Sequence, residues 1–419
     1  MRGIMPEVYT AVACPGCGCV CDDLRVTTDG GRVVAAERAC RLAEPWFLAQ
    51  TGGQSAEAFV GDRPATVAEA VAAAADLLRT ARRPLIYGLS RSTTAGQRAA
   101  VALADKLGAV IDTTASTGHA PSIMALQQVG ESTCTLGEVR QRADLVLFWG
   151  CDPVETHPRH LERYVPPAAA VWAVDTTATE TAVVAHRFVR VTPGRDWEAL
   201  WTLRQLVAGI EPRADADPGA PLAELRELAD RMRGCRFGVV FFGGGLVKAP
   251  LAHRTIEALL QLVTDLNRHT RFYARRLRRT GDVAGADSVL AWQTGYPFGV
   301  DLARGYPRYN PGEFTAPHVL ARGEVDVCLL VGSEAALDLP AAAAAHLGGI
   351  PVIALDPPGV SWPGAAVRVT TAVYGVHRPG TAYRLDEVPI PLRTILPTNL
   401  PDDGEVLAAI LTAVSPAAG

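Results

Sequence analysis

Five of the nine cysteines in this 419-residue chain lie within its first 40 residues. Cys14, Cys17 and Cys21 follow a Cys-x2-Cys-x3-Cys spacing, and Cys40 comes nineteen positions after Cys21. Three thiolates from one tight loop and a fourth from elsewhere in the chain form a typical ligand set for an iron-sulfur cluster. The spacing therefore predicts a [4Fe-4S] cluster held by Cys14, Cys17, Cys21 and Cys40, with Cys19 as a cysteine that is not a ligand.

The same cysteines could instead bind zinc, form disulfides or be a metal-free remnant. Cys-x2-Cys also begins many zinc sites, but their second half is usually another close pair of Cys or His, and here only Cys40 is available. Disulfides are not expected, because residues 1–10 contain no apolar segment typical of a secretory signal, which predicts a cytoplasmic, reducing location. The spacing favours a cluster, while a structural zinc and a metal-free remnant stay open.

Composition narrows the class of protein. The formal net charge of -4 argues against a nucleic-acid partner. The longest apolar stretches, at 143–149 and 237–247, are far shorter than the roughly 20 residues that a bilayer requires, so no membrane span is expected. A hydrophobic content of 48% with 20% charged residues, in a chain of this length, predicts two or three packed units.

The chain shows repeated short apolar runs followed by helical segments, which is typical of α/β proteins with parallel sheets. We predict a small N-terminal cysteine-loop unit at 1–50, followed by two doubly wound, mainly parallel α/β domains at 51–210 and 222–419. A segment rich in Pro, Asp and Gly at 211–221 reads as a linker. Helices are predicted at 66–79, 94–107 and 251–266, and strands at 84–88, 109–112, 145–150, 170–174, 188–191, 237–242, 325–332 and 350–355.

Ligands in such folds lie beyond the carboxyl ends of the strands. Gly243, Gly244 and Gly245 follow a predicted strand and would let the backbone approach a phosphate, although a plain turn or tight packing explains them equally well.

Several motifs together resemble a known family. They occupy residues 116–122, 135–139, 149–160, 310–313 and 380–386, besides the cysteine loop. In these segments the chain is similar to the B subunit of formylmethanofuran dehydrogenase, a molybdopterin oxidoreductase of the dimethyl sulfoxide reductase type. The resemblance implies an N-terminal cubane cluster and two pterin dinucleotides that hold molybdenum or tungsten between α/β domains.

The chain departs from the family at one position. The family places a metal-ligating Cys or selenocysteine directly before a His-Gly-Pro-Ser segment, and here that position is Gly118, followed by His119. Glycine has no side chain to bind a metal. We therefore expect no catalytic residue, with Gly118 and His119 as remnants, and no bound molybdopterin, molybdenum or tungsten. The pterin region would likewise be vestigial, at Gly150, Asp152, Pro153 and His157.

A relative of the dehydrogenase does not need the redox metal whose ligand is missing here. The formyltransferase/hydrolase complex resembles it but releases formate by hydrolysis. The resemblance implies a non-catalytic B subunit that assembles with an amidohydrolase-like A subunit, a C subunit and a formyltransferase D subunit. That complex moves a formyl group from tetrahydromethanopterin to a furan carrier with a polyglutamate tail. Two alternatives stay open: a catalytic molybdenum or tungsten dehydrogenase subunit, and an unrelated iron-sulfur or zinc-binding protein.

Two further segments attract attention. His157 and His160 have a spacing that metal ligands could use, but no third ligand is evident, so a structural role or a vestigial cofactor contact is expected. The run from Arg268 to Arg279 is dense in arginine and is typical of a solvated face or a subunit contact. One hypothesis is that Arg275, Arg276, Arg278 and Arg279 guide the acidic tail of the furan carrier.

Overall fold

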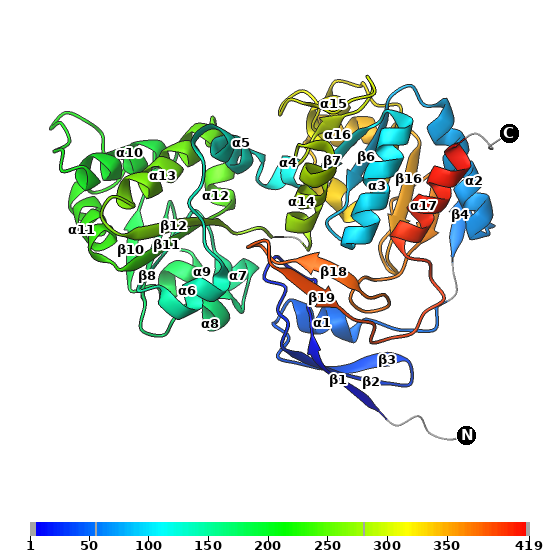
Figure 1. Ribbon diagram of the computed structural model, residues 1–419, viewed down its shortest axis with the longest axis horizontal. Coiled ribbons are helices and arrows are strands. Elements are labelled where there is room, and N and C mark those ends of the chain that lie inside the picture. The colour runs from blue at the N-terminus through cyan, green and yellow to red at the C-terminus, as the bar shows by residue number, and fades with distance from the viewer. Residues whose placement is uncertain (1–5, 55–56, 280, 416–419) are drawn as a thin grey trace. The chain divides into compact units, whose positions relative to one another are not determined.

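The computed structural model describes residues 6–54, 57–279 and 281–415, so the outermost residues of the predicted 1–50 and 222–419 ranges lie outside the described part. The chain divides into two compact units. Unit 1 contains residues 1–117 and 280–419, and unit 2 contains residues 118–279. Unit 2 is thus one continuous stretch of chain inserted into unit 1 (Figure 1).

Unit 1 is built on a nine-stranded sheet in the order β14-β13-β7-β6-β15-β16-β17-β4-β5. Its five central strands, from β7 to β17, run parallel. The strands are β4 (Ala58–Val60), β5 (Arg63–Ala65), β6 (Pro84–Gly88), β7 (Val110–Thr113), β13 (Val300–Asp301), β14 (Arg308–Tyr309), β15 (Val327–Val331), β16 (Val352–Asp356) and β17 (Val367–Thr370).

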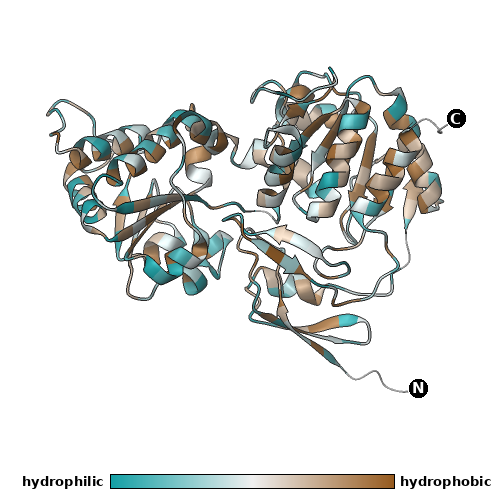
Figure 2. Cartoon of the chain, viewed as in Figure 1, coloured by the Kyte–Doolittle hydropathy of each residue, from teal (hydrophilic) through white to brown (hydrophobic). Residues whose placement is uncertain are grey.

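Helices cover both faces of this sheet. Side chains alternate along the strands, so Ile86 and Leu329 belong to one apolar cluster while Leu85 and Leu330 belong to another. The first cluster includes residues of α2 (Val67–Thr80), α3 (Thr94–Leu107), α14 (Val283–Thr294) and α17 (Asp403–Val414), and the second includes α15 (Ala316–Ala321), the 3-10 helix η1 (Ser333–Asp338) and α16 (Ala341–Leu347). Figure 2 shows the central strands as predominantly hydrophobic, as a sheet buried on both faces requires.

Two smaller sheets belong to unit 1. One joins β1 (Glu7–Val12), β2 (Leu24–Asp29) and β3 (Arg32–Glu37), with α1 (Ala43–Leu48) after it, and the other pairs β18 (Gly380–Tyr383) with β19 (Pro389–Leu392). The cysteine loop connects β1 to β2, and residues of this loop pack against the β18–β19 pair. The predicted N-terminal cysteine unit is therefore packed into unit 1.

Unit 2 has a five-stranded sheet in the order β10-β9-β8-β11-β12, and all of its pairs are parallel. The strands are β8 (Leu145–Trp149), β9 (Ala170–Asp175), β10 (Arg187–Arg190), β11 (Phe237–Phe242) and β12 (Arg271–Arg276). The helices are α5 (Ala120–Val129), α6 (Leu136–Arg142), α7 (Pro153–Thr156), α8 (His160–Tyr164), α9 (Glu180–Val184), α10 (Asp196–Val207), α11 (Leu222–Gly234), α12 (Gly244–Val247) and α13 (Ala252–Leu266), while the short α4 (Ala115–Gly118) lies at the crossing from unit 1.

The α/β fold class is confirmed, but the strands are distributed differently from the predicted ranges. Strands predicted to share the 51–210 region fall into two sheets, because β6 pairs with β15, far along the chain, whereas β8 pairs with β11. The predicted linker at 211–221 lies inside unit 2, between α10 and α11. Local hydrophobic patterns identify strands but do not encode which strand pairs with which.

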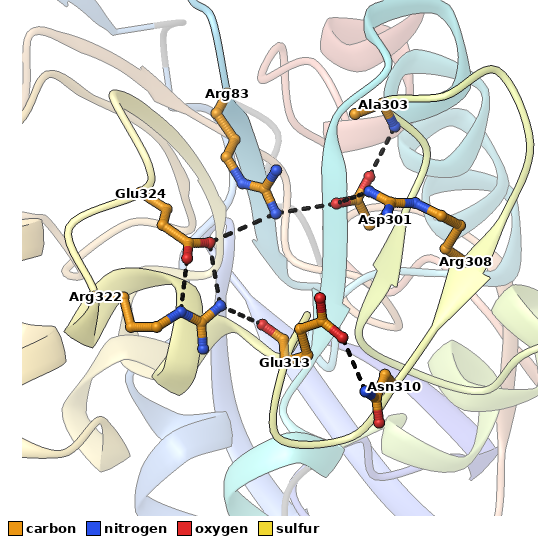
Figure 3. Close-up of polar contacts among 8 residues, drawn as sticks. All are labelled: Arg83, Asp301, Ala303, Arg308, Asn310, Glu313, Arg322 and Glu324. Carbon is orange, nitrogen blue, oxygen red and sulfur yellow. Dashed lines mark hydrogen bonds and ion pairs between the residues drawn. The ribbon is translucent and has the colours of Figure 1, made fainter.

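At the amino ends of the central strands of unit 1, charged side chains form a network (Figure 3). The fully buried Asp301 accepts hydrogen bonds from Arg83 at 3.0 Å and from Arg308 at 2.8 Å. Arg83 also lies 3.6 Å from Glu324, which pairs with Arg322. Arg322, Glu313 and Asn310 are joined by further hydrogen bonds, so the 310–313 motif is part of this network (Figure 3).

No helix in the described ranges has the length and apolar character needed to cross a bilayer; the longest, α13, has 15 residues.

Candidate functional site

The cysteine loop is closed by its own backbone. The Cys14 amide donates to the Cys21 carbonyl at 2.8 Å, and the Val20 amide donates to the Cys17 carbonyl at 3.1 Å. Val20 has a positive φ of 36°, which is rare for a β-branched residue and marks a strained turn. The β2–β3 hairpin then returns the chain to Cys40, whose carbonyl accepts hydrogen bonds at the start of α1.

The four predicted cluster ligands act on one another electrostatically. Burial is the main reason why the pKa of Cys14 lies well above its ordinary value, and Cys17, Cys21 and Cys40 also raise it. Cys14 and Cys21 are buried, while Cys17 and Cys40 are half-buried. A protonated thiol must lose its proton before it can bind a metal.

The spacing of these thiols bears on the kind of metal site. Within the part of the chain that the structure describes, no three His, Cys, Asp or Glu side chains are gathered closely enough to hold a single ion. A zinc ion with Zn–S bonds of about 2.3 Å would require sulfur atoms only about 3.8 Å apart. A cubane spreads its ligands over several iron atoms, so its thiolates lie farther apart than those around a single zinc ion.

Gly118 and His119 lie at the junction of α4 and α5. Gly118 is exposed, and a Cβ atom added there would meet nothing within 4 Å. The loop thus has room for a side chain, although the sequence supplies none. His119 is 7% exposed, and its carbonyl accepts hydrogen bonds from the amide and the hydroxyl of Ser122. The hydroxyl of neighbouring Thr117 donates to the Thr114 carbonyl at 3.2 Å.

The predicted pterin region lies at the carboxyl ends of β8 and β11 in unit 2. Gly150 has a φ of 57°, and its carbonyl accepts a hydrogen bond from the Gly245 amide at 2.8 Å. A Cβ atom on Gly245 would lie 2.8 Å from the Cα atom of Gly150. Close packing of the two loops therefore accounts for Gly243 and Gly245, whereas a Cβ atom on Gly244 would meet nothing within 4 Å.

Asp152 and Pro153 lie at the starts of nearby helices and stabilise them there. The Asp152 carboxylate accepts hydrogen bonds from the Thr181 hydroxyl at 2.6 Å and from the Glu180 amide at 3.2 Å, which joins it to the start of α9. Pro153 occupies the first turn of α7, where its missing amide hydrogen costs nothing. Both residues thus have structural tasks in the chain as it stands.

His157 and His160 are buried in unit 2. The two ring nitrogens of His157 contact the Thr156 hydroxyl at 2.9 Å and the Arg278 carbonyl at 2.8 Å. The His160 ring packs edge-on against Phe241 at 4.6 Å, and burial lowers its pKa to about 3, with a further contribution from His157. A structural role explains both.

The arginine run is not the solvated face that the sequence predicted. Arg275, Arg276 and Arg278 are 3%, 8% and 7% exposed, because β12 and the residues after it are packed into unit 2. Arg276 forms an ion pair with the equally buried Glu131 at 3.1 Å. Three of the four arginines assigned to an acidic tail are therefore part of the interior, and charge reversal there would disrupt packing.

Unit 1 contains a cavity of about 330 Å³ that the sequence did not suggest. It lies at the carboxyl end of β16, beside the loop after Asp356 and the side chains of Phe59 and Arg368. The Asp356 carboxylate is already engaged by the amide and hydroxyl of Ser333, both at 2.6 Å. The Arg368 guanidinium stacks on Phe59 at 4.5 Å.

The fold and the cysteine loop define a two-unit α/β protein with a candidate iron-sulfur centre. No family model matches the chain. It is 37% identical to the B subunit of the tungsten-containing formylmethanofuran dehydrogenase 2 of Methanocaldococcus jannaschii, over 98% of this chain and 99% of the relative. It is 36% identical to the B subunit of the same name from Methanococcus maripaludis, over 97% and 99%. The chain belongs to the family of formylmethanofuran dehydrogenase B subunits.

Other similarities are more distant. The B subunit of the formyltransferase/hydrolase complex Fhc of Methylorubrum extorquens is 28% identical over 66% of this chain and 74% of the relative. The solved FhcABCD complex from that organism, in complex with methylofuran, contains a chain with a TM-score of 0.72 and 26% identity, covering 85% of this chain and 98% of that one. Acetylene hydratase from Pelobacter acetylenicus shares the fold alone, with a TM-score of 0.71 and 11% identity over 97% of this chain and 69% of that one.

Sequence reasoning missed Arg91 and Tyr374, whose side chains contact the cysteine loop. Neither stands in a recognisable motif, and the contacts join segments far apart in the chain. The Thr135–Val139 motif, by contrast, carries a readable local signal, since Thr135 and Glu138 form the capping box of α6.

Proposed function

We propose that this chain is a non-redox B subunit of a formyltransferase/hydrolase complex, in which it serves as a scaffold. The observation that carries the proposal is Gly118, which stands where the family resemblance places a metal-ligating Cys or selenocysteine. A soft thiolate or selenolate selects and tunes molybdenum or tungsten. Without it, the metal that exchanges electrons with carbon dioxide and formate loses its protein ligand.

Neighbouring side chains offer no equivalent ligand. Thr117 has only a hard hydroxyl, which is engaged with the Thr114 carbonyl. His119 is buried, and as an imidazole it differs in softness and reach from a thiolate at residue 118. The loop is otherwise intact, since a Cβ atom at Gly118 would be accommodated. The missing ligand is therefore not explained by a lack of space for a side chain at residue 118.

The proposed reaction needs no electron carrier. Transferring a formyl group from tetrahydromethanopterin to a furan carrier exchanges one C–N bond for another, and hydrolysis adds water and releases formate. The oxidation state of the carbon does not change in either step. We assign the transfer to a formyltransferase D subunit and the hydrolysis to an amidohydrolase-like A subunit, with a C subunit completing the assembly. The relative's structure with methylofuran supports such a setting.

The cysteine loop fits a [4Fe-4S] cluster held by Cys14, Cys17, Cys21 and Cys40. Such a cluster supplies one-electron chemistry when bound, which the proposed reaction does not use. In this chain the four thiols would therefore hold it as a structural element that ties the loop to α1. Molybdopterin, molybdenum and tungsten have no assigned part in the proposal.

A second candidate function is favoured by the comparisons. The relatives named as tungsten-containing dehydrogenase subunits match at 36–37% identity over nearly the whole chain, whereas the B subunit of the Fhc complex matches at 28% over 66% of it. A tungsten or molybdenum formylmethanofuran dehydrogenase subunit with an unusual coordination sphere is thus the alternative to test.

Both candidates can be tested on the complex purified through an affinity tag on this chain. We expect co-purification of the amidohydrolase-like and formyltransferase subunits. The complex should release formate from formylated furan carrier without any electron acceptor. Electron transfer from formylated carrier to a viologen dye, at a rate comparable with formate release, would instead establish the dehydrogenase.

A further inference from the structure

Unit 1 has its topological switch point between β6 and β15, the place where a doubly wound sheet normally offers a crevice to ligands. Strand β6 pairs with β7 on one side and with β15 on the other, so the order in which the chain adds strands reverses at β6. At their carboxyl ends the Leu89 amide donates to the Val331 carbonyl at 3.0 Å. Gly88, with a φ of 115°, approaches so closely that a Cβ atom would lie 2.3 Å from the Val331 oxygen. The backbones of these two strand ends are therefore held close together.

The cysteine loop is held by the side chains that emerge at this point. Arg91 follows β6, and its Nη1 atom donates to the carbonyls of Pro15 at 3.1 Å and Gly16 at 3.3 Å. These two carbonyls belong to the residues between Cys14 and Cys17. The Nε atom of Arg91 donates to the carboxylate of Glu334, which follows β15. The guanidinium thus links both strand ends to the loop.

A second donor reaches the same carbonyl from the C-terminal part of the chain. The Tyr374 hydroxyl lies 3.1 Å from the Pro15 oxygen and 3.4 Å from the Ser90 oxygen, and the residue is 4% exposed. The Leu385 amide donates to the Gly18 carbonyl at 2.8 Å. Protein groups therefore hold the loop at both Pro15 and Gly18.

Apolar contacts complete the arrangement. Ala13, just before the loop, and Val20, within it, belong to one buried cluster with Tyr374, Ile390 and Leu392. Polar and apolar contacts with the rest of unit 1 therefore hold the loop at several points along its length.

We propose that the strand ends of β6 and β15 form a preformed seat for the cysteine loop, with Arg91 as its positioning residue, so that the loop keeps its conformation whether or not iron is bound. The seat does not depend on the non-redox function proposed above. Arginine suits this position because its planar group can donate to two carbonyls and a carboxylate at once, which a lysine ammonium reproduces only in part.

The test measures how fast iodoacetamide alkylates the individual cysteines of the full-length chain after iron has been removed with a chelator. Cys14 and Cys21 are 6% and 7% exposed and should react slowly while the loop stays seated. Arg91→Gln should raise their rates by about tenfold or more, since it removes hydrogen bonds from a charged donor. Arg91→Lys should give an intermediate rate.

Internal references and matched controls separate local from global effects. Cys134 and Cys328 are 5% and 0% exposed and lie outside the loop, so their rates should stay unchanged in every variant. Arg98→Gln removes an exposed arginine of α3 and should leave all rates as in the wild type. If Arg91→Gln also exposes the reference cysteines, Tyr374→Phe, which deletes a single hydroxyl, provides the milder variant.

The outcomes are distinct. Faster alkylation confined to Cys14 and Cys21, in the order Gln, then Lys, then wild type, supports the seat. Rapid alkylation of Cys14 and Cys21 in the iron-free wild type would overturn it, as would rates in both Arg91→Gln and Tyr374→Phe that equal the wild type. Because the assay uses iron-free protein and no formyl substrate, a failure here would leave the proposed function unaffected.

Discussion

The hydroxyl of Tyr374 donates a hydrogen bond to the carbonyl of Pro15 at 3.1 Å, although 359 positions separate the two residues in the sequence. The contact joins the cysteine loop to the C-terminal part of unit 1. It explains why the loop is not an independent N-terminal unit. The candidate metal centre and the large sheet of unit 1 are therefore expected to unfold together.

The first prediction concerns the space at Gly118. Gly118→Ala should change the free energy of unfolding by no more than about 1 kcal/mol, because the new Cβ atom meets nothing within 4 Å. Gly88→Ala is the matched contrast. It should cost about 2–4 kcal/mol, since its φ of 115° and the Val331 oxygen at 2.3 Å both oppose a side chain. Urea denaturation of the two variants measures this, and equal costs would contradict the local geometry.

The second prediction concerns the network at the amino ends of the unit 1 strands. Asp301→Asn should lower the free energy of unfolding by about 3–5 kcal/mol, because it leaves the guanidinium groups of Arg83 and Arg308 without their buried counterion. Asp215→Asn removes an exposed partner of Arg213 and should leave stability close to that of the wild type. Denaturant titration of both variants checks the contrast. A small effect at Asp301 would show that the network is dispensable.

The third prediction concerns pH. Burial raises the pKa of Asp282 to about 8, although hydrogen bonds from Tyr383, Gly285 and Gln97 act in the opposite direction. Because the folded state then holds a proton that the unfolded state has released, the contribution of Asp282 is fully present below about pH 4 and is lost as the pH rises towards 8. Its slope is at most about 1.4 kcal/mol per pH unit.

Comparison of the wild type with Asp282→Asn isolates the pH-dependent contribution of Asp282 to stability. Burial also raises the pKa of Asp112 to about 7 and of Asp403 to about 6, and both groups remain in the variant. The difference in unfolding free energy between wild type and variant should therefore change between pH 4 and pH 8, with the wild type losing its advantage as the pH rises. A difference that is constant over this range would show that Asp282 is ionised throughout.

Many local elements could be predicted from the sequence. The helix predicted at 94–107 has those bounds in the structure, because Thr93 caps its start and Gly108, with a φ of 62°, ends it. The strand predicted at 237–242 is likewise confirmed. These signals lie within a few residues of the elements that they delimit.

Features that depend on distant residues were not predictable. The burial of Arg276 requires Glu131, which lies far upstream in the sequence, so the arginine run looked like a surface feature. The insertion of unit 2 into unit 1 depends on strand pairing between β6 and β15. In the candidate site, the cysteine spacing was readable from one short loop, whereas Arg91 and Tyr374 reach that loop from remote positions.

The central claim, that the chain has lost the redox metal, is tested most directly by the metal and pterin content of the complex purified through this chain. Inductively coupled plasma mass spectrometry and pterin fluorescence should find no molybdenum, tungsten or pterin, while iron at about four atoms per chain would agree with a single cubane cluster. Stoichiometric tungsten or molybdenum together with pterin would contradict the account.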